Sequence, residues 1–155
     1  FIKKKQNKRK INLSVKIQRK KEIKYGITKL STYRKFARRV KSSRKKLKNM
    51  FIKLNSKNKK IIGYGATAKS TTILNYCKIN NNLISYFVDT TKDKQNKYTP
   101  GTKIPIFKYS GLIEKNVDFI FLGAWNFKEE IFEKEKKFIK RGGKFIIHTP
   151  VPKII

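Results

Sequence analysis

The sequence predicts an α/β fold: a Rossmann-like, mostly parallel open sheet with flanking helices, preceded by a long basic amphipathic helix. From about residue 59 onward, short apolar runs alternate with helical patterns, which is the order that a parallel sheet produces. The first apolar run ends in Gly63-x-Gly65-x-x-Ala68, a turn typical of a strand that leads into a helix. Before residue 59, apolar residues recur at helical spacing among lysines and arginines.

Within this domain we expect the order β-α-β-β-β-α-β. The expected strands are residues 60–64, 83–88, 104–107, 117–122 and 144–148, and the expected helices are residues 69–78 and 127–141. A long polar loop is expected over residues 90–103. Pro105 predicts a marginal or edge strand, and Gly142 ends the last helix. The inward positions of that helix are expected to be Ile131, Phe132, Phe138 and Ile139.

The chain divides in the sequence into three parts. Residues 1–20 are interpreted as a basic tail, residues 21–58 as a basic amphipathic helical segment, and residues 59–155 as the Rossmann-like domain. Residues 1–10 have no periodicity and indicate a solvated tail, whereas apolar residues alternate over 11–17 and predict a short strand. Ser31 is the expected N-cap of a helix of about seven turns. Its apolar stripe is Tyr33, Phe36, Ala37, Val40, Leu47, Met50, Phe51 and Leu54.

Charge is distributed unevenly along the chain. The net charge is +32, and 25 of the 41 lysines and arginines lie in residues 1–60 beside a single acid, Glu22. Such an excess attracts polyanions, but an AT-rich genome also enriches lysine. The apolar stripe of the helix is interpreted first as a packing surface. We do not expect nucleic acid to be the main partner, and a basic RNA- or acidic-partner-binding protein is kept as an alternative.

Metal, redox and membrane chemistry find little support in the sequence. Cys77 and His148 are the only residues of their types, so no disulfide framework or zinc cluster is expected. A free thiol is compatible with the cytoplasm, which is the expected location. No apolar run reaches the roughly 18 residues of a membrane span. The chain begins with Phe, and a fragment of a longer protein is expected.

The turn after the first expected strand is the main candidate for chemistry. A helix N-terminus directs free amides toward an anion, and a lysine and several hydroxyls follow in the first helical turn. An acid ends the second expected strand, near where a ribose-binding carboxylate lies in dinucleotide sites. Aromatic and amide side chains occur in later loops, which are expected at the carboxyl edge of the sheet. The candidate substrate-binding residues are Gly63, Tyr64, Gly65, Ala66, Lys69, Ser70, Asp89, Tyr98, Trp125 and Asn126.

Plainer interpretations stay open for several of these residues. The glycine turn also occurs where a strand merely meets a helix, and Trp125 also fits a residue that caps the core. His148 has no carboxylate or nucleophile near it in sequence, so a catalytic relay is not expected and no catalytic residue is assigned. Four glutamates are interpreted as a solvated helix face beside lysines: Glu129, Glu130, Glu133 and Glu135.

Several ordered motifs resemble one family. The quoted runs are residues 63–72 (GYGATAKSTT), 74–77 (LNYC), 88–89 (VD), 94–106 (KQNKYTPGTKIPI), 124–127 (AWNF) and 141–146 (RGGKFI), with a preceding helix at 33–40. Over residues 22–155 the chain resembles the C-terminal domain of S-adenosylmethionine-dependent sugar C-methyltransferases. The resemblance implies a domain that helps hold a nucleotide-diphosphate sugar and faces a separate methyltransferase domain.

The resemblance also implies what this chain lacks. In the full-length enzymes a cysteine-rich zinc module and a central S-adenosylmethionine-binding domain come first, and the catalytic bases lie in the central part. Residues 1–20 would retain only the tail of that part, so the chain is expected to be inactive alone and to bind no cofactor or metal itself. Ser70-Thr71-Thr72 and Asn96 depart from the family pattern, in which Gly-Asn-Thr and a glycine are common. A nicotinamide- or other nucleotide-binding domain, supported by Asp89, is the second hypothesis.

Overall fold

The structure is a computed structural model that describes residues 11–111 and 113–155. The chain forms two compact units, Phe1–Val40 and Lys41–Ile155. The expected solvated tail at residues 1–10 lies outside the described residues. Among the described helices, none combines the length and the apolar character needed to cross a membrane.

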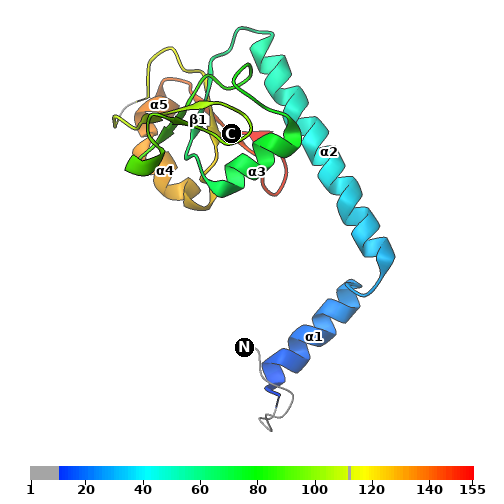
Figure 1. Ribbon diagram of the computed structural model, residues 1–155. Helices are drawn as coiled ribbons and strands as arrows, with labels where there is room; N and C mark the ends of the chain where they lie inside the picture. The colour runs from blue at the N-terminus through cyan, green and yellow to red at the C-terminus, as the bar shows by residue number, and fades with distance from the viewer. Residues whose placement is uncertain (1–10, 112) are drawn as a thin grey trace. The chain divides into compact units, whose positions relative to one another are not determined.

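A seven-stranded sheet lies at the centre of the second unit (Figure 1). The strands are β1 (Ile61–Tyr64), β2 (Phe87–Asp89), β3 (Lys97–Tyr98), β4 (Pro105–Lys108), β5 (Phe119–Leu122), β6 (Lys144–Ile147) and β7 (Lys153–Ile154). Their order in the sheet is β3-β4-β2-β1-β5-β6-β7. The five inner strands are parallel, and β3 and β7 are antiparallel at the two edges. The predicted Rossmann-like, mostly parallel open sheet is confirmed, and the two edge strands were not predicted.

Helices cover both faces of the sheet, as a parallel sheet requires. On one face, α3 (Ala68–Cys77) and the last turns of α2 (Leu30–Asn55) contribute Leu74, Leu47 and Phe51 to a core that includes Phe121. On the other face, α4 (Lys128–Lys134) and α5 (Lys136–Lys140) supply Ile131 and Phe138 to a second core around Phe145. Figure 1 shows α3 and the α4–α5 pair separated by the sheet.

The strand predicted over residues 11–17 is wrong, because this segment belongs to the helix α1 (Leu13–Tyr25). The Asn12 side chain caps the helix by accepting a hydrogen bond from the Ser14 amide at 3.1 Å. A strand needs a neighbour for its backbone groups, whereas a helix satisfies them internally. Residues 11–40 contain no strand of the sheet. A helix therefore satisfies the backbone hydrogen bonds of this segment, although its apolar residues alternate.

The long basic helix is confirmed as α2, with two differences from the prediction. It begins at Leu30, so Ser31 lies within the first turn and is not the N-cap. Only the C-terminal part of the apolar stripe enters the core, where Leu47 and Phe51 are buried. Tyr33 and Phe36 remain more than half exposed.

The last predicted helix is interrupted. A 3₁₀ turn, η2 (Trp125–Phe127), precedes α4, and the helix breaks at Glu135 before α5 begins. Ile139, predicted to face inward, is 41% exposed. The buried residues of the segment are Ile131, Glu135 and Phe138, whose spacing of four and then three residues places them on one side of a helix. Ile139 follows Phe138 directly and therefore points about 100° away from that side.

Two further segments differ from their expected form. Pro105 does not mark an edge, because β4 pairs with β2 on one side and with β3 on the other. A proline is tolerated at the first residue of a strand, and Pro105 holds that position. The polar loop expected over residues 90–103 contains the 3₁₀ turn η1 (Lys92–Lys94) as well as β3.

The contrast within α2 leads to a stability prediction. Phe51 is fully buried and packs edge-on against Phe121, with ring centroids 5.7 Å apart. We expect Phe51→Ala to lower the free energy of unfolding by about 3–5 kcal/mol, because it removes buried apolar surface and leaves a cavity. Phe36→Ala, in the same helix but 57% exposed, is the control and should change it by less than about 0.5 kcal/mol. Urea unfolding measures both, and equal losses would contradict this packing.

Candidate functional site

The strand order places a crevice between β1 and β5. From β1 the chain proceeds to β2 and β4 on one side of the sheet, and β5 and β6 lie on the other. Ligands of open α/β sheets bind at such a reversal, outside the carboxyl ends of the strands. The loops that follow β1 and β5 approach closely here, and the Gly123 amide donates to the Tyr64 carbonyl at 2.9 Å. A Cβ on Gly123 would lie 2.2 Å from the Gly65 oxygen, so only glycine fits.

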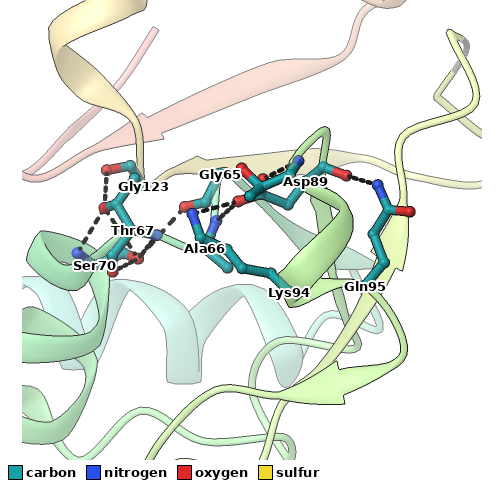
Figure 2. Close-up of polar contacts among 9 residues, drawn as sticks. Gly65, Ala66, Thr67, Ser70, Asp89, Lys94, Gln95 and Gly123 are labelled. Atoms are coloured by element: carbon teal, nitrogen blue, oxygen red, sulfur yellow. Dashed lines mark hydrogen bonds and ion pairs between the residues drawn. The ribbon is translucent and has the colours of Figure 1, made fainter.

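The start of α3 is held by a capping box. Thr67 is the N-cap; its hydroxyl accepts from the Ser70 amide at 3.1 Å, and its amide donates to Ser70 Oγ at 2.9 Å. Figure 2 shows both residues beside Gly123, whose carbonyl accepts a hydrogen bond from the Thr67 hydroxyl. Ser70 is fully buried, so its hydroxyl serves the fold. Ala68, the last residue of the glycine pattern, is exposed, and Ser70 is the residue of this turn that lies against Gly123.

Asp89 joins the end of β2 to the turn after β1. Its carboxylate accepts from the Ala66 amide at 2.8 Å and from the Thr91 amide at 2.8 Å, and Lys94 Nζ lies 3.3 Å away. Figure 2 shows this cluster, with Gln95 donating to the Asp89 carbonyl. The Asp89 side chain is only 6% exposed. Its hydrogen-bonding capacity is therefore largely used inside the protein, which leaves little for the ribose expected from the sequence.

The pKa of Asp89 reflects two opposed effects. Burial alone would raise the pKa of the carboxyl group, but the hydrogen bonds from Thr91 and Ala66, together with the charge of Lys94, outweigh burial and hold the pKa below its usual value of 3.8. The folded state therefore favours the carboxylate. The contact stabilises the fold above the usual pKa, and this stabilisation is lost as the pH falls through the lowered one.

The open backbone amides lie in the first turn of α3 and not in the glycine turn that precedes it. The Ala66 and Thr67 amides are used by Asp89 and Ser70. The amides of Ala68 and Lys69 make no hydrogen bond within the described part of the chain, and both residues are exposed. An anion would therefore meet the first turn of α3 and not the glycine turn itself.

Lys69, Asn126 and Trp125 come together beside these amides. Lys69 Nζ donates to Asn126 Oδ1 at 3.1 Å and lies 5.4 Å from the centroid of the Trp125 ring. Lys69 lies in the first turn of α3, which follows β1, whereas the other two residues lie in η2, which follows β5. The group therefore spans the crevice between the two strands. Trp125 and Asn126 also line a cavity of about 560 Å³. Its other lining residues are Phe127, Lys128, Glu129, Glu130, Ile147, Thr149, Pro150 and Lys153.

Three other candidate residues lie away from this group. Gly63 is buried in β1, where a Cβ would lie 2.3 Å from the Phe87 ring. Tyr64 is 7% exposed and packs against Tyr109, with ring centroids 5.3 Å apart. Tyr98 is 66% exposed, but it pairs with Pro105 at the amino end of β4. The expectation that the loop of Tyr98 lies at the carboxyl edge is wrong, because β3 runs antiparallel.

Comparison with known proteins agrees with this architecture. The family described as "C-methyltransferase C-terminal domain" matches residues 1–152. The chain belongs to this family. It is also 35% identical over 130 residues to the C-methyltransferase NovU of Streptomyces niveus. The match covers 84% of this chain and 31% of that relative, so the chain spans about a third of the length of the C-methyltransferase it matches.

The structure explains one departure of this C-methyltransferase domain from the expected family pattern. Asn96, where the resemblance leads us to expect a glycine, has a φ of +60°. This left-handed region is open to glycine, and asparagine is among the side chains that tolerate it best. The exchange therefore keeps the backbone conformation. Its amide donates to the Ile106 carbonyl at 2.8 Å and joins the loop to β4.

Sequence reasoning missed a buried acid in the domain. Glu135, interpreted as part of a solvated face, is 3% exposed and accepts from the Tyr109 hydroxyl at 2.5 Å. Burial raises the pKa of Glu135 despite this hydrogen bond. Burial and the nearby charge of Glu135 raise the pKa of Tyr64 to about 12. The available signal was helical spacing, because Glu135 lies four residues after Ile131 and three before Phe138, both of which were expected to face inward.

His148 lies in the core and not in the cavity. It is 7% exposed, and its ring centroid lies 5.6 Å from that of Phe121. Its Nδ1 has no hydrogen-bond partner among the described residues, and burial lowers its pKa. Nor do three His, Cys, Asp or Glu side chains come together as a potential metal site anywhere in residues 11–111 and 113–155.

The Asp89 contact gives a pH-dependent prediction. Asp89→Asn should lower the free energy of unfolding at pH 7 by about 1.5–3 kcal/mol, since it removes the charge from three hydrogen-bonded contacts. As the pH falls below the usual pKa of 3.8 and through the lowered pKa of Asp89, the wild-type carboxyl group also becomes protonated, so the difference between the two proteins should shrink. Urea unfolding at neutral and acid pH measures this. Asp93→Asn is the control, because Asp93 is exposed; a pH-independent difference for Asp89→Asn would contradict the assignment.

Proposed function

We propose that this chain is the substrate-binding C-terminal part of an S-adenosylmethionine-dependent C-methyltransferase that acts on a nucleotide-activated sugar. The observation that carries the proposal is the group formed by Lys69, Asn126 and Trp125 beside the open amides of Ala68 and Lys69. Family membership supports the methyltransferase context. We place the enzyme in the cytoplasm, where nucleotide-activated sugars are substrates.

The charge of this group favours a diphosphate. The N-terminus of α3 carries a partial positive charge, and the Lys69 ammonium adds a full one at the same end of the helix. Asp89, at the end of β2, is paired with Lys94 and buried. An anionic ligand would therefore meet the open amides of Ala68 and Lys69 and the Lys69 ammonium. The carboxylate at the end of β2 would not repel it, because Asp89 is already paired with Lys94.

The uncharged parts of the ligand would occupy the cavity. Trp125 belongs both to the cationic group and to the cavity wall, so its ring can stack on a base or cover a sugar face. Asn126 Oδ1 accepts from Lys69, which leaves the amide hydrogens to donate to a sugar hydroxyl or to a base edge. A volume of about 560 Å³ is within the range of small-molecule sites.

The same residues do not fit the methyl donor. S-adenosylmethionine carries a sulfonium cation and a ribose, which a carboxylate normally receives. The Asp89 carboxylate is turned inward to the Ala66 and Thr91 amides, and Lys69 would repel a cation. We therefore assign donor binding and methyl transfer to a separate methyltransferase domain and derive no chemical step from this chain. The inward Asp89 likewise weakens the alternative of a nicotinamide-binding domain.

Binding of a nucleotide-diphosphate sugar is the first test. Isothermal titration should give a measurable Kd for the wild-type chain, and Lys69→Ala should weaken it about tenfold or more, the effect of losing one charge-assisted hydrogen bond. Lys97→Ala, an exposed lysine on β3, is the matched control and should leave the Kd unchanged. Trp125 is the only tryptophan, so its fluorescence offers a second readout and a comparison with NAD. A folded wild-type chain that gives no heat, or one that prefers NAD, would refute the proposal.

The division of labour is the second test. Incubated with S-adenosylmethionine and a nucleotide-diphosphate sugar, the 155-residue chain should yield no methylated sugar by mass spectrometry, because the Asp89 carboxylate is turned inward and Lys69 would repel the sulfonium of the donor. NovU of Streptomyces niveus, supplied with its own substrate, serves as the positive control. Product formed at a rate that scales with the concentration of this chain would show that the assignment of chemistry to another domain is wrong.

A further inference from the structure

The first unit carries a charge that nothing in the described structure balances. Residues 11–40 contain ten lysines and arginines and one acid, Glu22. Every ion pair among the described residues involves Lys59 or a later residue. Apart from the single acid Glu22, the cations of residues 11–40 have no counter-charge within their two helices, and their mutual repulsion falls when a polyanion replaces the small counterions.

The two helices of this unit also enclose a groove. Gly26 ends α1 with a φ of +83°, and its amide donates to the Glu22 and Ile23 carbonyls, so α1 stops there and α2 begins a few residues later, at Leu30. The resulting groove has a volume of about 520 Å³. It is lined by Tyr25, Thr32, Lys35, Arg38 and Arg39. All five belong to Phe1–Val40, so the groove is complete within one unit.

The lining combines the two kinds of group that bind single-stranded nucleic acids. Lys35, Arg38 and Arg39 are exposed and present charge to phosphates. Tyr25 is 66% exposed and places an aromatic ring at the same groove. Proteins that bind single strands without sequence preference use such a basic groove, with aromatic rings on which unpaired bases stack. A base paired within a duplex is not available to a ring in this position.

A membrane surface fits this unit less well. An interfacial helix needs one apolar face. The apolar residues of α1 do not form one, because Leu13, Val15 and Ile23 point to different sides at 3.6 residues per turn. None of the residues of α1 is buried. The exposed Tyr33 and Phe36 of α2 lie outside the groove lining. The groove itself offers three cations and one ring, which suits a flexible polyanion with bases better than a lipid layer.

We propose that the groove between α1 and α2 binds single-stranded nucleic acid through its phosphates and one stacked base, independently of the substrate site. The test uses the 155-residue chain and a fluorescent oligouridylate about 12 nucleotides long, followed by anisotropy. The triple variant K35E/R38E/R39E should weaken binding at least tenfold. Between about 50 and 200 mM salt, the slope of log K against log salt should be smaller in magnitude for this variant than for the wild-type chain by about 2. Each phosphate contact with a single strand contributes about 0.7 to that slope, and the variant removes three cations.

A second triple variant separates a site from diffuse charge. K97E/K115E/K140E changes the net charge equally, and its three lysines are exposed residues of the second unit. It should weaken binding far less than K35E/R38E/R39E. Equal weakening by the two would show that the charge acts diffusely and would overturn the proposal.

Tyr25→Ala tests the contribution of the bases. It should weaken oligouridylate binding about fivefold or more and leave binding to heparin, a polyanion without bases, unchanged. Tyr98→Ala is the matched control, because Tyr98 is equally exposed, at 66%, on β3. Equal loss for both polymers, no effect of Tyr25→Ala, or tighter binding to polyglutamate or anionic vesicles than to the oligonucleotide would refute a nucleic-acid site. Because the groove shares no residue with the substrate site, failure here leaves the nucleotide-sugar titration unaffected.

Discussion

The Asp89 carboxylate organises the edge of the sheet on which the candidate site depends. It accepts hydrogen bonds from the Ala66 amide in the turn after β1 and from the Thr91 amide beyond β2, and it pairs with Lys94. The contact ties two neighbouring parallel strands together at their carboxyl ends, where the backbone has left the sheet and lost its ladder partners. A buried carboxylate that accepts several hydrogen bonds is stabilised as the anion. The turn therefore has a defined shape before any ligand arrives.

This internal use of Asp89 determines which chemistry remains available. A glycine turn with a following acid often serves a dinucleotide, with the turn on the pyrophosphate and the acid on the ribose. Here the acid occupies one amide of the turn, and the capping box of Thr67 and Ser70 occupies another. The open donors are the amides of Ala68 and Lys69 and the ammonium of Lys69. An edge of this kind suits an anion presented by a substrate and does not suit a cationic methyl donor.

The parts of the fold that were predictable are those with a strong local signal. The apolar run of β1, the turn after it and the glycine end of α5 all depend on residues adjacent in sequence. The failures involve partners distant in sequence. The alternation at residues 11–17 lacks a neighbouring strand and becomes helical. Glu135 is buried with the Tyr109 hydroxyl, 26 residues away, as its hydrogen-bond partner.

The candidate site divides in the same way. The sequence by itself determined that a strand, a glycine turn and a helix carrying Lys69 follow each other, and that the first 60 residues are strongly basic. Only the tertiary structure decided that Asn126 and Trp125 reach Lys69 from β5 while Tyr98 lies at the opposite edge. The physical reason is that strand order and direction are set by the packing of both sheet faces. No local spacing of residues records which loops that packing brings to the same edge.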